Sequence, residues 1–232
     1  MKTVGLIGGM SWESTVTYYQ IINTYVKEKL GGFHSAKCVL YSVDFAEIES
    51  RMAAGAWTEA AEILGDAARS LERAGADLIL ICTNTLHKVF GLVAACVSVP
   101  LLHIADAAAD ALDEKGFKTV ALFGTKYTMQ QDFYRARLAG RGFRVLVPDE
   151  KDMDEVNRII FDELCLGKIR DESRRVYVEI IKKLAARGAE AAILGCTEIG
   201  MLVRPEDAGT PLFDTAVIHA RRAVEMALAG DA

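Results

Sequence analysis

Two segments of this 232-residue chain each end an apolar run with the pair Cys-Thr: the first reaches Cys82-Thr83 through Asp77-Leu-Ile-Leu-Ile, and the second reaches Cys196-Thr197 through Ala191-Ala-Ile-Leu-Gly. A thiolate can take a proton from carbon, and a thiol can return one. Two thiols that act on opposite faces of one carbon would therefore remove a proton from one side and replace it from the other. We predict this paired acid–base chemistry for Cys82 and Cys196.

A second pair of similar segments indicates that the two cysteines belong to two copies of one unit. Residues 2–8 read KTVGLIG and residues 118–124 read KTVALFG, at nearly the separation of the two cysteines. Most other paired positions have diverged, so the surviving Cys-Thr match favours function over duplication alone. A single cysteine after an apolar run is more simply interpreted as a buried, inert thiol. We give that interpretation to Cys38, Cys96 and Cys165.

Composition excludes several classes of protein. The length allows one large domain or two small ones, and 51% of the residues are hydrophobic. A net charge of −5 without runs of like charge does not suggest a nucleic-acid partner. No apolar run approaches the roughly 20 residues that span a bilayer, and the N-terminus does not resemble a signal peptide. We expect a cytoplasmic protein with no membrane partner.

The remaining motifs do not predict a metal or nucleotide site. The five cysteines contain no CxxC pair, so reduced thiols are expected rather than disulfides. The four histidines show no HxxxH or HExxH spacing. We interpret His87 as a helix-surface or supporting residue and His103 as a satisfied core residue. The segment around Gly8-Gly9 does not fit GxGxxG, and we interpret it as a tight strand-to-helix turn.

Strand-like and helix-like patterns alternate along the chain. Apolar runs predict strands at residues 3–7, 39–43, 78–81, 119–123, 144–147 and 191–194. Helical spacing predicts helices at residues 12–29, 57–74, 105–112, 129–138, 154–164, 173–187 and 215–228. Such alternation predicts an α/β fold with parallel sheets covered by helices. We expect two similar Rossmann-like halves with the active site between them, formed by residues 1–103 plus 212–232 and by residues 104–211.

Two helices carry detailed expectations. Ser11 should cap the first helix, with Val16, Tyr19, Ile22 and Val26 as its apolar face. The helix at residues 57–74 has a strong apolar stripe, and Gly75 should be its C-cap.

The predicted strands also place the chemistry. Ligands of open parallel sheets bind outside the carboxyl ends of the strands, where Cys82 and Cys196 lie. The loops that follow Gly8 and Gly124 lie at the same ends, and their backbone N–H groups and hydroxyls can hold a carboxylate. Proton removal from Cα needs donors that stabilise the resulting charge, and we expect Asn84, Thr85 and Thr197 to supply them. The alternative role for these three residues is turn formation and helix capping.

Longer motifs resemble a known family. Residues 5–15 (GLIGGMSWEST), 82–88 (CTNTLHK) and 195–199 (GCTEI) resemble the aspartate/glutamate racemase family, in the subgroup that contains broad-specificity bacterial amino-acid racemases. The similarity runs almost end to end and includes residues 42–48 and 131–134. The resemblance implies racemisation of a small amino-acid substrate without pyridoxal phosphate, metal or other cofactor. It also implies a homodimer.

The resemblance assigns roles to individual residues. Cys196 would take the proton from the L-enantiomer and Cys82 from the D-enantiomer, and retention of Cys82 favours reversible racemisation. The residues that match carboxylate-binding positions are Asn84, Thr85, Thr125, Thr128 and Thr197. Met10 and Met52 match positions that line the pocket, and Cys165 and Glu198 complete the predicted substrate-binding set.

One departure concerns the substrate side chain. Aspartate-specific relatives place an arginine and a lysine where this chain has Glu49 and Cys165, although Arg51 lies close by. We therefore expect a broad or non-acidic preference. The alternatives are an aspartate/glutamate-specific racemase and an enzyme similar to maleate isomerase or malonate decarboxylase. A non-catalytic module that binds small acids is disfavoured, because a binder does not need two bases.

Overall fold

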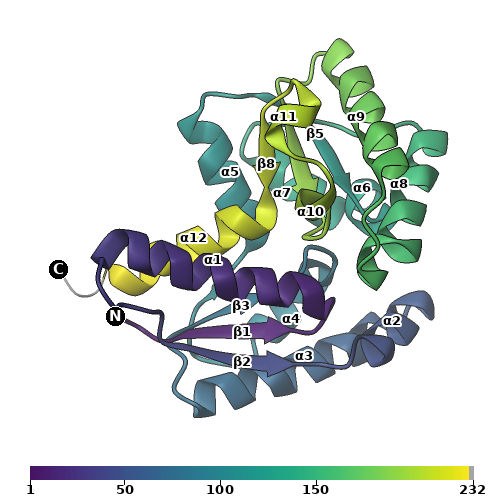
Figure 1. The fold of residues 1–232 in the computed structure, drawn as a ribbon. Helices are drawn as coiled ribbons and strands as arrows, with labels where there is room; N and C mark the ends of the chain where they lie inside the picture. The colour runs from purple at the N-terminus through teal and green to yellow at the C-terminus, as the bar shows by residue number, and fades with distance from the viewer. Residues whose placement is uncertain (230–232) are drawn as a thin grey trace. The chain divides into compact units, whose positions relative to one another are not determined.

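The computed structural model describes residues 1–229 and divides the chain into two compact units (Figure 1). Unit 1 comprises Met1–His103 and the segment that begins at His219, and unit 2 comprises Ile104–Ile218. The predicted boundaries followed residues 103 and 211; the predicted first half also included residues 230–232, which lie outside the described residues. No helix within residues 1–229 is long and apolar enough to cross a membrane.

Unit 1 contains a four-stranded parallel sheet in the order β2-β1-β3-β4. Its strands are β1 (Val4–Gly8), β2 (Cys38–Ser42), β3 (Leu78–Ile81) and β4 (Leu101–Leu102). Every residue of β1 and β3 is buried, as expected for strands covered on both faces. Its helices are α1 (Trp12–Leu30), α2 (Phe45–Ala53), α3 (Trp57–Arg73), η1 (Thr85–Val89), α4 (Phe90–Ala94) and most of α12 (Thr215–Leu228).

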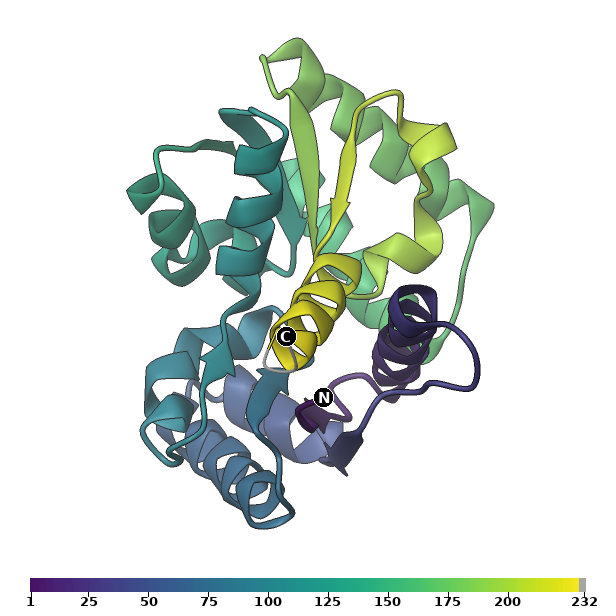
Figure 2. The same ribbon diagram turned by 90° about the vertical axis from the view of Figure 1, so that its left-hand side faces the viewer.

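Helix α12 returns to unit 1 and is held there by hydrogen bonds. The backbone N–H of Lys2 donates to the Ala227 carbonyl at 2.9 Å, so the start of β1 and the end of α12 lie side by side (Figure 2). The Tyr25 hydroxyl on α1 donates to Glu225 at 2.9 Å. The last helix therefore completes a unit that begins at the N-terminus.

Unit 2 repeats the same topology, with the strand order β6-β5-β7-β8, all parallel. Its strands are β5 (Thr119–Gly124), β6 (Arg144–Leu146), β7 (Ala191–Gly195) and β8 (Leu212–Asp214). Its helices are α5 (Ile104–Glu114), α6 (Lys126–Gln130), α7 (Asp132–Gly140), α8 (Glu150–Asp162), η2 (Leu164–Leu166), α9 (Asp171–Ala186), α10 (Ile199–Leu202) and α11 (Pro205–Ala208). The predicted α/β class with two similar parallel-sheet halves is confirmed.

The sheet of unit 2 carries a hydrophobic core on each face. Alternate residues of β5 point to opposite sides, so Phe123 packs with α8 and α9 while Leu122 packs with α5 and α7. Burial on both faces explains why the strands are continuous apolar runs in the sequence.

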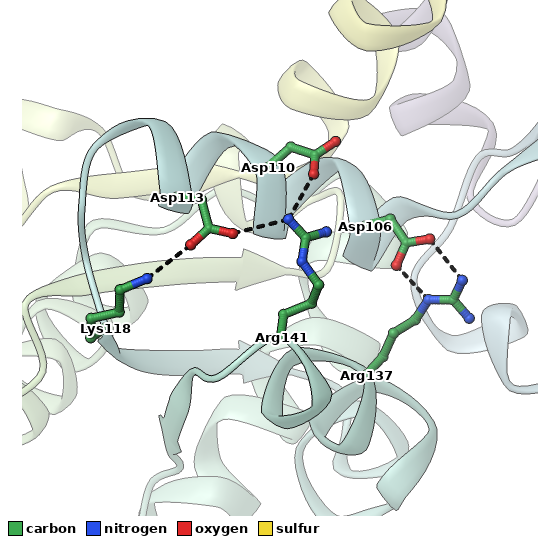
Figure 3. Close-up of polar contacts among 6 residues, drawn as sticks. All are labelled: Asp106, Asp110, Asp113, Lys118, Arg137 and Arg141. Atoms are coloured by element: carbon green, nitrogen blue, oxygen red, sulfur yellow. Dashed lines mark hydrogen bonds and ion pairs between the residues drawn. The ribbon is translucent and has the colours of Figure 1, made fainter.

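Ion pairs join α5 to the end of α7 on the surface of unit 2 (Figure 3). The Arg137 guanidinium forms two hydrogen bonds with the Asp106 carboxylate, at 2.5 and 2.7 Å. Arg141 binds both Asp110 and Asp113 at 2.9 Å, and Lys118 reaches Asp113 at 3.0 Å. The contacts connect two helices that cover one face of the sheet.

The predicted apolar face of α1 is partly wrong. Ser11 caps the helix as predicted, but the side chains of Val16 and Tyr19 are 46% and 52% exposed. The buried line runs instead through Tyr18, Ile22 and Val26, which recur every fourth residue and so lie on one face of the helix. The prediction included two residues of the neighbouring, exposed face.

Several other boundaries differ from the prediction. The helix predicted at residues 129–138 is two helices, because Gln131 adopts extended backbone (φ −85°, ψ 152°) between α6 and α7. The predicted helix at residues 154–164 begins earlier, where Asp149 caps α8. Helix α3 ends with Ala74 as its C-cap, and Gly75 follows with a φ of 87°. Helix α2 was not predicted, although Asp44 caps it.

Candidate functional site

In unit 1 the first Cys-Thr pair lies beside the turn that follows β1. Strands β1 and β3 are neighbours, and the backbone N–H of Cys82 donates to the Ile7 carbonyl at 2.9 Å. Gly9 has a φ of 94°, and a Cβ there would lie 2.2 Å from the Val43 carbonyl oxygen, so this turn requires glycine. The Gly9 N–H donates to Thr15 at 2.9 Å. The predicted tight turn is present, and it places Met10 at the same edge of the sheet as Cys82.

The other predicted residues of unit 1 are buried near this edge. Asn84 and Thr85 follow Cys82 directly and lie at the start of η1, whose first turn the Asn84 side chain does not cap. Met52 lies on α2, which begins just after β2 ends. Met10 follows β1, and Cys82, Asn84 and Thr85 follow β3, so these four residues lie at the carboxyl end of the sheet, while Met52 is buried on α2.

Burial governs the charge state of Cys82. The Cys82 side chain is fully enclosed, and this burial raises the pKa of its thiol far above the ordinary value. Burial therefore favours the protonated thiol of Cys82, which is the form that can donate a proton to carbon.

Unit 1 contains a cluster of three buried histidines, His87, His103 and His219, which was not predicted from the sequence. His87 was expected to be on a helix surface or in a supporting role; it is buried, and its Nδ1 donates to the Thr83 carbonyl at 2.7 Å. The His87 ring lies 4.6 Å from that of His103 and 5.8 Å from that of His219, between centroids. His103 is a core residue, as predicted. No local pattern joins these positions, because only the fold brings them together.

The partners of His219 define its protonation state. Its Nε2 lies 3.0 Å from the Leu102 carbonyl, which can only accept, so Nε2 carries the proton. The Tyr18 hydroxyl lies 3.0 Å from Nδ1 and can donate to it. Burial, together with the neighbouring His87, lowers the pKa of His219 to about 3. His219 is therefore a neutral imidazole.

In unit 2 the second Cys-Thr pair follows a strand pair that requires glycine. Gly124 of β5 and Gly195 of β7 are partners in register. A Cβ on Gly195 would lie 2.5 Å from the Phe123 carbonyl oxygen, and one on Gly124 would lie 2.6 Å from the Gly195 carbonyl oxygen. Because Gly124 and Gly195 have no side chains, the two strand ends can pack closely, and Thr125 and Cys196 follow them at neighbouring positions.

The two predicted threonines after β5 also have a structural role. The Thr125 hydroxyl caps α6 by accepting from the Thr128 N–H, and the two hydroxyl oxygens lie 3.3 Å apart. Both side chains are buried at the strand end. The structural role and the predicted carboxylate-binding role use the same pair of hydroxyls.

Cys196 contacts an acidic side chain. Its Sγ donates to Glu198 Oε2 at 2.9 Å, and the Thr197 hydroxyl donates to the same oxygen at 3.0 Å. Burial raises the pKa of the Cys196 thiol well above its ordinary value, and the charges of Glu198 and then Cys165 raise it further. Unit 2 thus brings Thr125, Thr128, Cys165, Cys196, Thr197 and Glu198 together.

The cysteines differ in burial. Cys38, Cys96 and Cys165 were predicted to be buried and inert, but they are only half-buried, whereas Cys82 and Cys196 are buried. The prediction was wrong for the first three because Cys38 lies on an edge strand and Cys96 and Cys165 lie near the ends of short helices. All five are free thiols.

Unit 2 also has a mainly apolar cavity of about 690 Å³. Leu194, Val203, Leu212, Phe213 and Val217 are among its lining residues, and none of the predicted site residues is. An apolar wall is a poor environment for a zwitterion, so the candidate site remains at the strand ends.

The fold and the site together define a class of α/β enzyme that contains two copies of one unit. In each copy a Cys-Thr pair follows the third strand. The chain belongs to the Asp/Glu/Hydantoin racemase family, whose model matches residues 7–223. It is thus a racemase of this family.

Individual relatives match over the full length. A protein of known structure from Yersinia pestis is 54% identical, with a TM-score of 0.91 over 98% of this chain and 100% of the other. An aspartate racemase homologue from Pyrococcus horikoshii OT3 is 38% identical, with a TM-score of 0.85 over 98% and 99%. The broad specificity amino-acid racemase RacX of Bacillus subtilis (strain 168) is 23% identical over 97% of this chain and 98% of its own.

Proposed function

We propose that this chain racemises amino acids without a cofactor, with Cys82 and Cys196 as the two acid–base groups. One observation carries the proposal: the two cysteines that occupy matching strand ends in the two units are buried, while the other three cysteines are half-buried. Two matching thiols are what inversion at Cα requires.

The reaction follows from the properties of these residues. One cysteine, as thiolate, takes the Cα proton from one face, and the other, as thiol, donates its proton to the opposite face. The intermediate charge spreads onto the substrate carboxylate. Hydrogen-bond donors at the strand ends, the side chains of Asn84, Thr85, Thr125, Thr128 and Thr197, stabilise that charge. By resemblance to the family, Cys196 acts on the L-enantiomer and Cys82 on the D-enantiomer.

A broad or non-acidic substrate preference has support from the charged residues. Cys165, at the position of a lysine in aspartate-specific relatives, cannot carry a positive charge and packs against the core cluster that contains Cys196. Arg51 donates to the Glu47 carbonyl of its own helix at 2.8 Å and pairs with Glu59 at 3.6 Å. Glu49 is exposed. The name of the Bacillus subtilis relative, a broad specificity racemase, agrees with this preference.

A homodimer is part of the proposal. Trp12, Val16 and Tyr19 are exposed and follow one line along α1, and an exposed apolar stripe of this kind marks an interaction surface. Light scattering of the purified protein measures its oligomeric state directly. A monomer mass at micromolar protein concentration would refute the dimer.

The test is proton exchange at Cα. We expect a panel of L-amino acids, incubated in heavy water without pyridoxal phosphate, to gain deuterium at Cα and to form D-enantiomers with the carbon skeleton unchanged. Cys82→Ser and Cys196→Ser should each lower kcat/KM by at least about 10²-fold, because a serine hydroxyl is a far weaker acid. Cys96→Ser is the matched control and should retain activity.

Three outcomes contradict the proposal. Full turnover in both serine variants would remove the thiol mechanism. Activity on aspartate and glutamate alone would remove the substrate preference. A changed carbon skeleton would instead identify the isomerase or decarboxylase alternative.

A further inference from the structure

The contact between Cys196 and Glu198 has the geometry of a proton-transfer pair. The Cys196 thiol and the Thr197 hydroxyl both donate to Glu198 Oε2, at 2.9 and 3.0 Å. One carboxylate oxygen thus accepts hydrogen bonds from both the thiol and the hydroxyl. The Glu198 side chain is only 2% exposed, so water competes little for this oxygen.

The surroundings oppose simple ionisation of the thiol. Glu198 and Cys165 both act on Cys196 in the direction that keeps it protonated. Tyr177 on α9 is buried within reach of both Cys196 and Glu198, and Asp214 at the end of β8 feels the charge of Glu198. Each of these neighbours is an acid, and an additional negative charge on sulfur is therefore costly. Cys196 becomes a base only if its proton moves to a nearby acceptor.

We propose that Glu198 is this acceptor, and that Cys196 and Glu198 work as a thiol–carboxylate pair. The inference rests on the proposed racemase function and deepens it. It gives Glu198 a role beyond the substrate binding predicted from the sequence: the carboxylate acts through Cys196 and does not touch the reacting carbon.

The protons balance over one turnover. The Cys196 S–H bond breaks as an O–H bond forms on Glu198, which leaves a thiolate beside a neutral carboxylic acid. The substrate ammonium supplies the positive charge that favours this transfer. The thiolate then takes the Cα proton, and the Cys82 S–H bond breaks as a new Cα–H bond forms on the other face. After product release the Glu198 proton returns through solvent to the Cys82 thiolate.

The rate of the Glu198→Gln variant distinguishes a proton acceptor from a residue that acts on Cys196 by its charge alone. Glu198→Gln removes a negative charge and should lower the pKa of the Cys196 thiol. If Glu198 only suppressed ionisation, the variant would have more thiolate at neutral pH and would be faster. If Glu198 accepts the proton, the variant loses the acceptor and is slower.

The experiment compares three variants in the full-length chain, on the best substrate of the exchange panel. We expect Glu198→Gln to lower kcat about 10²-fold or more near pH 7.5 while KM changes only a few-fold. Its residual rate should rise with pH as the thiol ionises by itself. Glu198→Asp, which retains the acid on a shorter side chain, should recover part of the loss. Glu190→Gln is the matched control and should retain the wild-type kcat. Glu190 directly precedes β7, and its carboxylate accepts hydrogen bonds from the Lys118 and Thr119 N–H groups, away from Cys196.

A second readout does not need turnover. Ultraviolet titration of thiolate, taken as the difference from Cys196→Ser, should show Cys196 ionising at lower pH in Glu198→Gln than in the wild-type chain. An unchanged titration, or a Glu198→Gln kcat equal to or above that of the wild-type chain, overturns the pair. Wild-type protein that exchanges no Cα proton overturns the proposed racemase function instead, and the titration still tests whether the two side chains are coupled.

Discussion

At the scale of single residues, the two matching cysteines are not equivalent. Burial alone raises the pKa of the Cys82 thiol, whereas the Cys196 thiol also bonds to a carboxylate and feels a second acidic neighbour. In the proposed mechanism, the two thiols would therefore reach the thiolate state by different routes. Residues at matching positions of a repeat have acquired different local chemistry.

The neutral state of His219 predicts a specific acid sensitivity. The pKa of His219 is about 3 in the folded chain and near 6.5 when exposed. Between these values the unfolded chain binds one more proton, so the contribution of His219 to stability is complete above pH 6.5 and falls as the pH drops toward 3. We expect His219→Gln to reduce the slope of the unfolding free energy against pH by about 1.4 kcal/mol per pH unit between pH 4 and 6.

Urea unfolding at a series of pH values measures this slope. His34→Gln, at an exposed position, is the matched control for the substitution itself. Equal slopes in wild-type and His219→Gln protein would show that the burial of His219 does not set the acid response.

The candidate site was predictable where its signal is local. Each of Cys82 and Cys196 ends an apolar strand, and parallel strands place their ends at one edge, so sequence alone located both. The turn at Gly8-Gly9 was predictable for the same reason. The histidine cluster was not, since His87, His103 and His219 are distant in sequence and the contacts depend on where α12 returns.

At the scale of elements, periodicity identified the long helices and strands but not the short or half-exposed ones. Strand β3 and helix α12 have the predicted bounds. Helices α10 and α11 contain four residues each, too few for an apolar stripe to appear. Strand β8 has three residues. Such elements depend on packing against a formed sheet, which local sequence does not encode.

The ion pairs between α5 and α7 predict a modest, salt-dependent contribution to stability. The Arg137 and Asp106 side chains are about 40% exposed, so water and salt screen them, although the two-bond geometry is favourable. We expect Arg137→Met to lower the unfolding free energy by about 0.5–1 kcal/mol at low ionic strength, and by less in about 1 M NaCl. Denaturant unfolding at both salt concentrations measures this.

Arg135→Met, on the same helix but outside the network of Figure 3, is the control. A loss that does not shrink in salt would assign the effect to packing of the arginine stem rather than to the ion pair.

At the scale of the whole molecule, the two units differ in how the chain builds them. Unit 2 is one continuous segment, whereas unit 1 needs both the first 103 residues and the segment from His219. We expect residues 104–218 alone to unfold cooperatively, and residues 1–103 alone to lack a cooperative transition, because the partners of Tyr18, Tyr25 and Lys2 on α12 are missing. Circular dichroism melts of the two fragments measure this.

The contact between His219 and Leu102 suggests a control for the fragment experiment. The Leu102 carbonyl lies 3.0 Å from His219, so a short glycine–serine linker can join His103 to His219 directly. This single-unit chain should regain a cooperative transition. Cooperative melting of residues 1–103 without the last helix would contradict the dependence of unit 1 on α12.

The return of α12 to the first strand has a consequence for biosynthesis. As a ribosome extends this polypeptide, the portion translated second can fold as soon as it emerges, while the portion translated first still lacks its final helix. Tyr18 and its apolar neighbours on α1 therefore stay uncovered until α12 has been synthesised. Unit 1 therefore matures after unit 2, and it is the unit more in need of a chaperone.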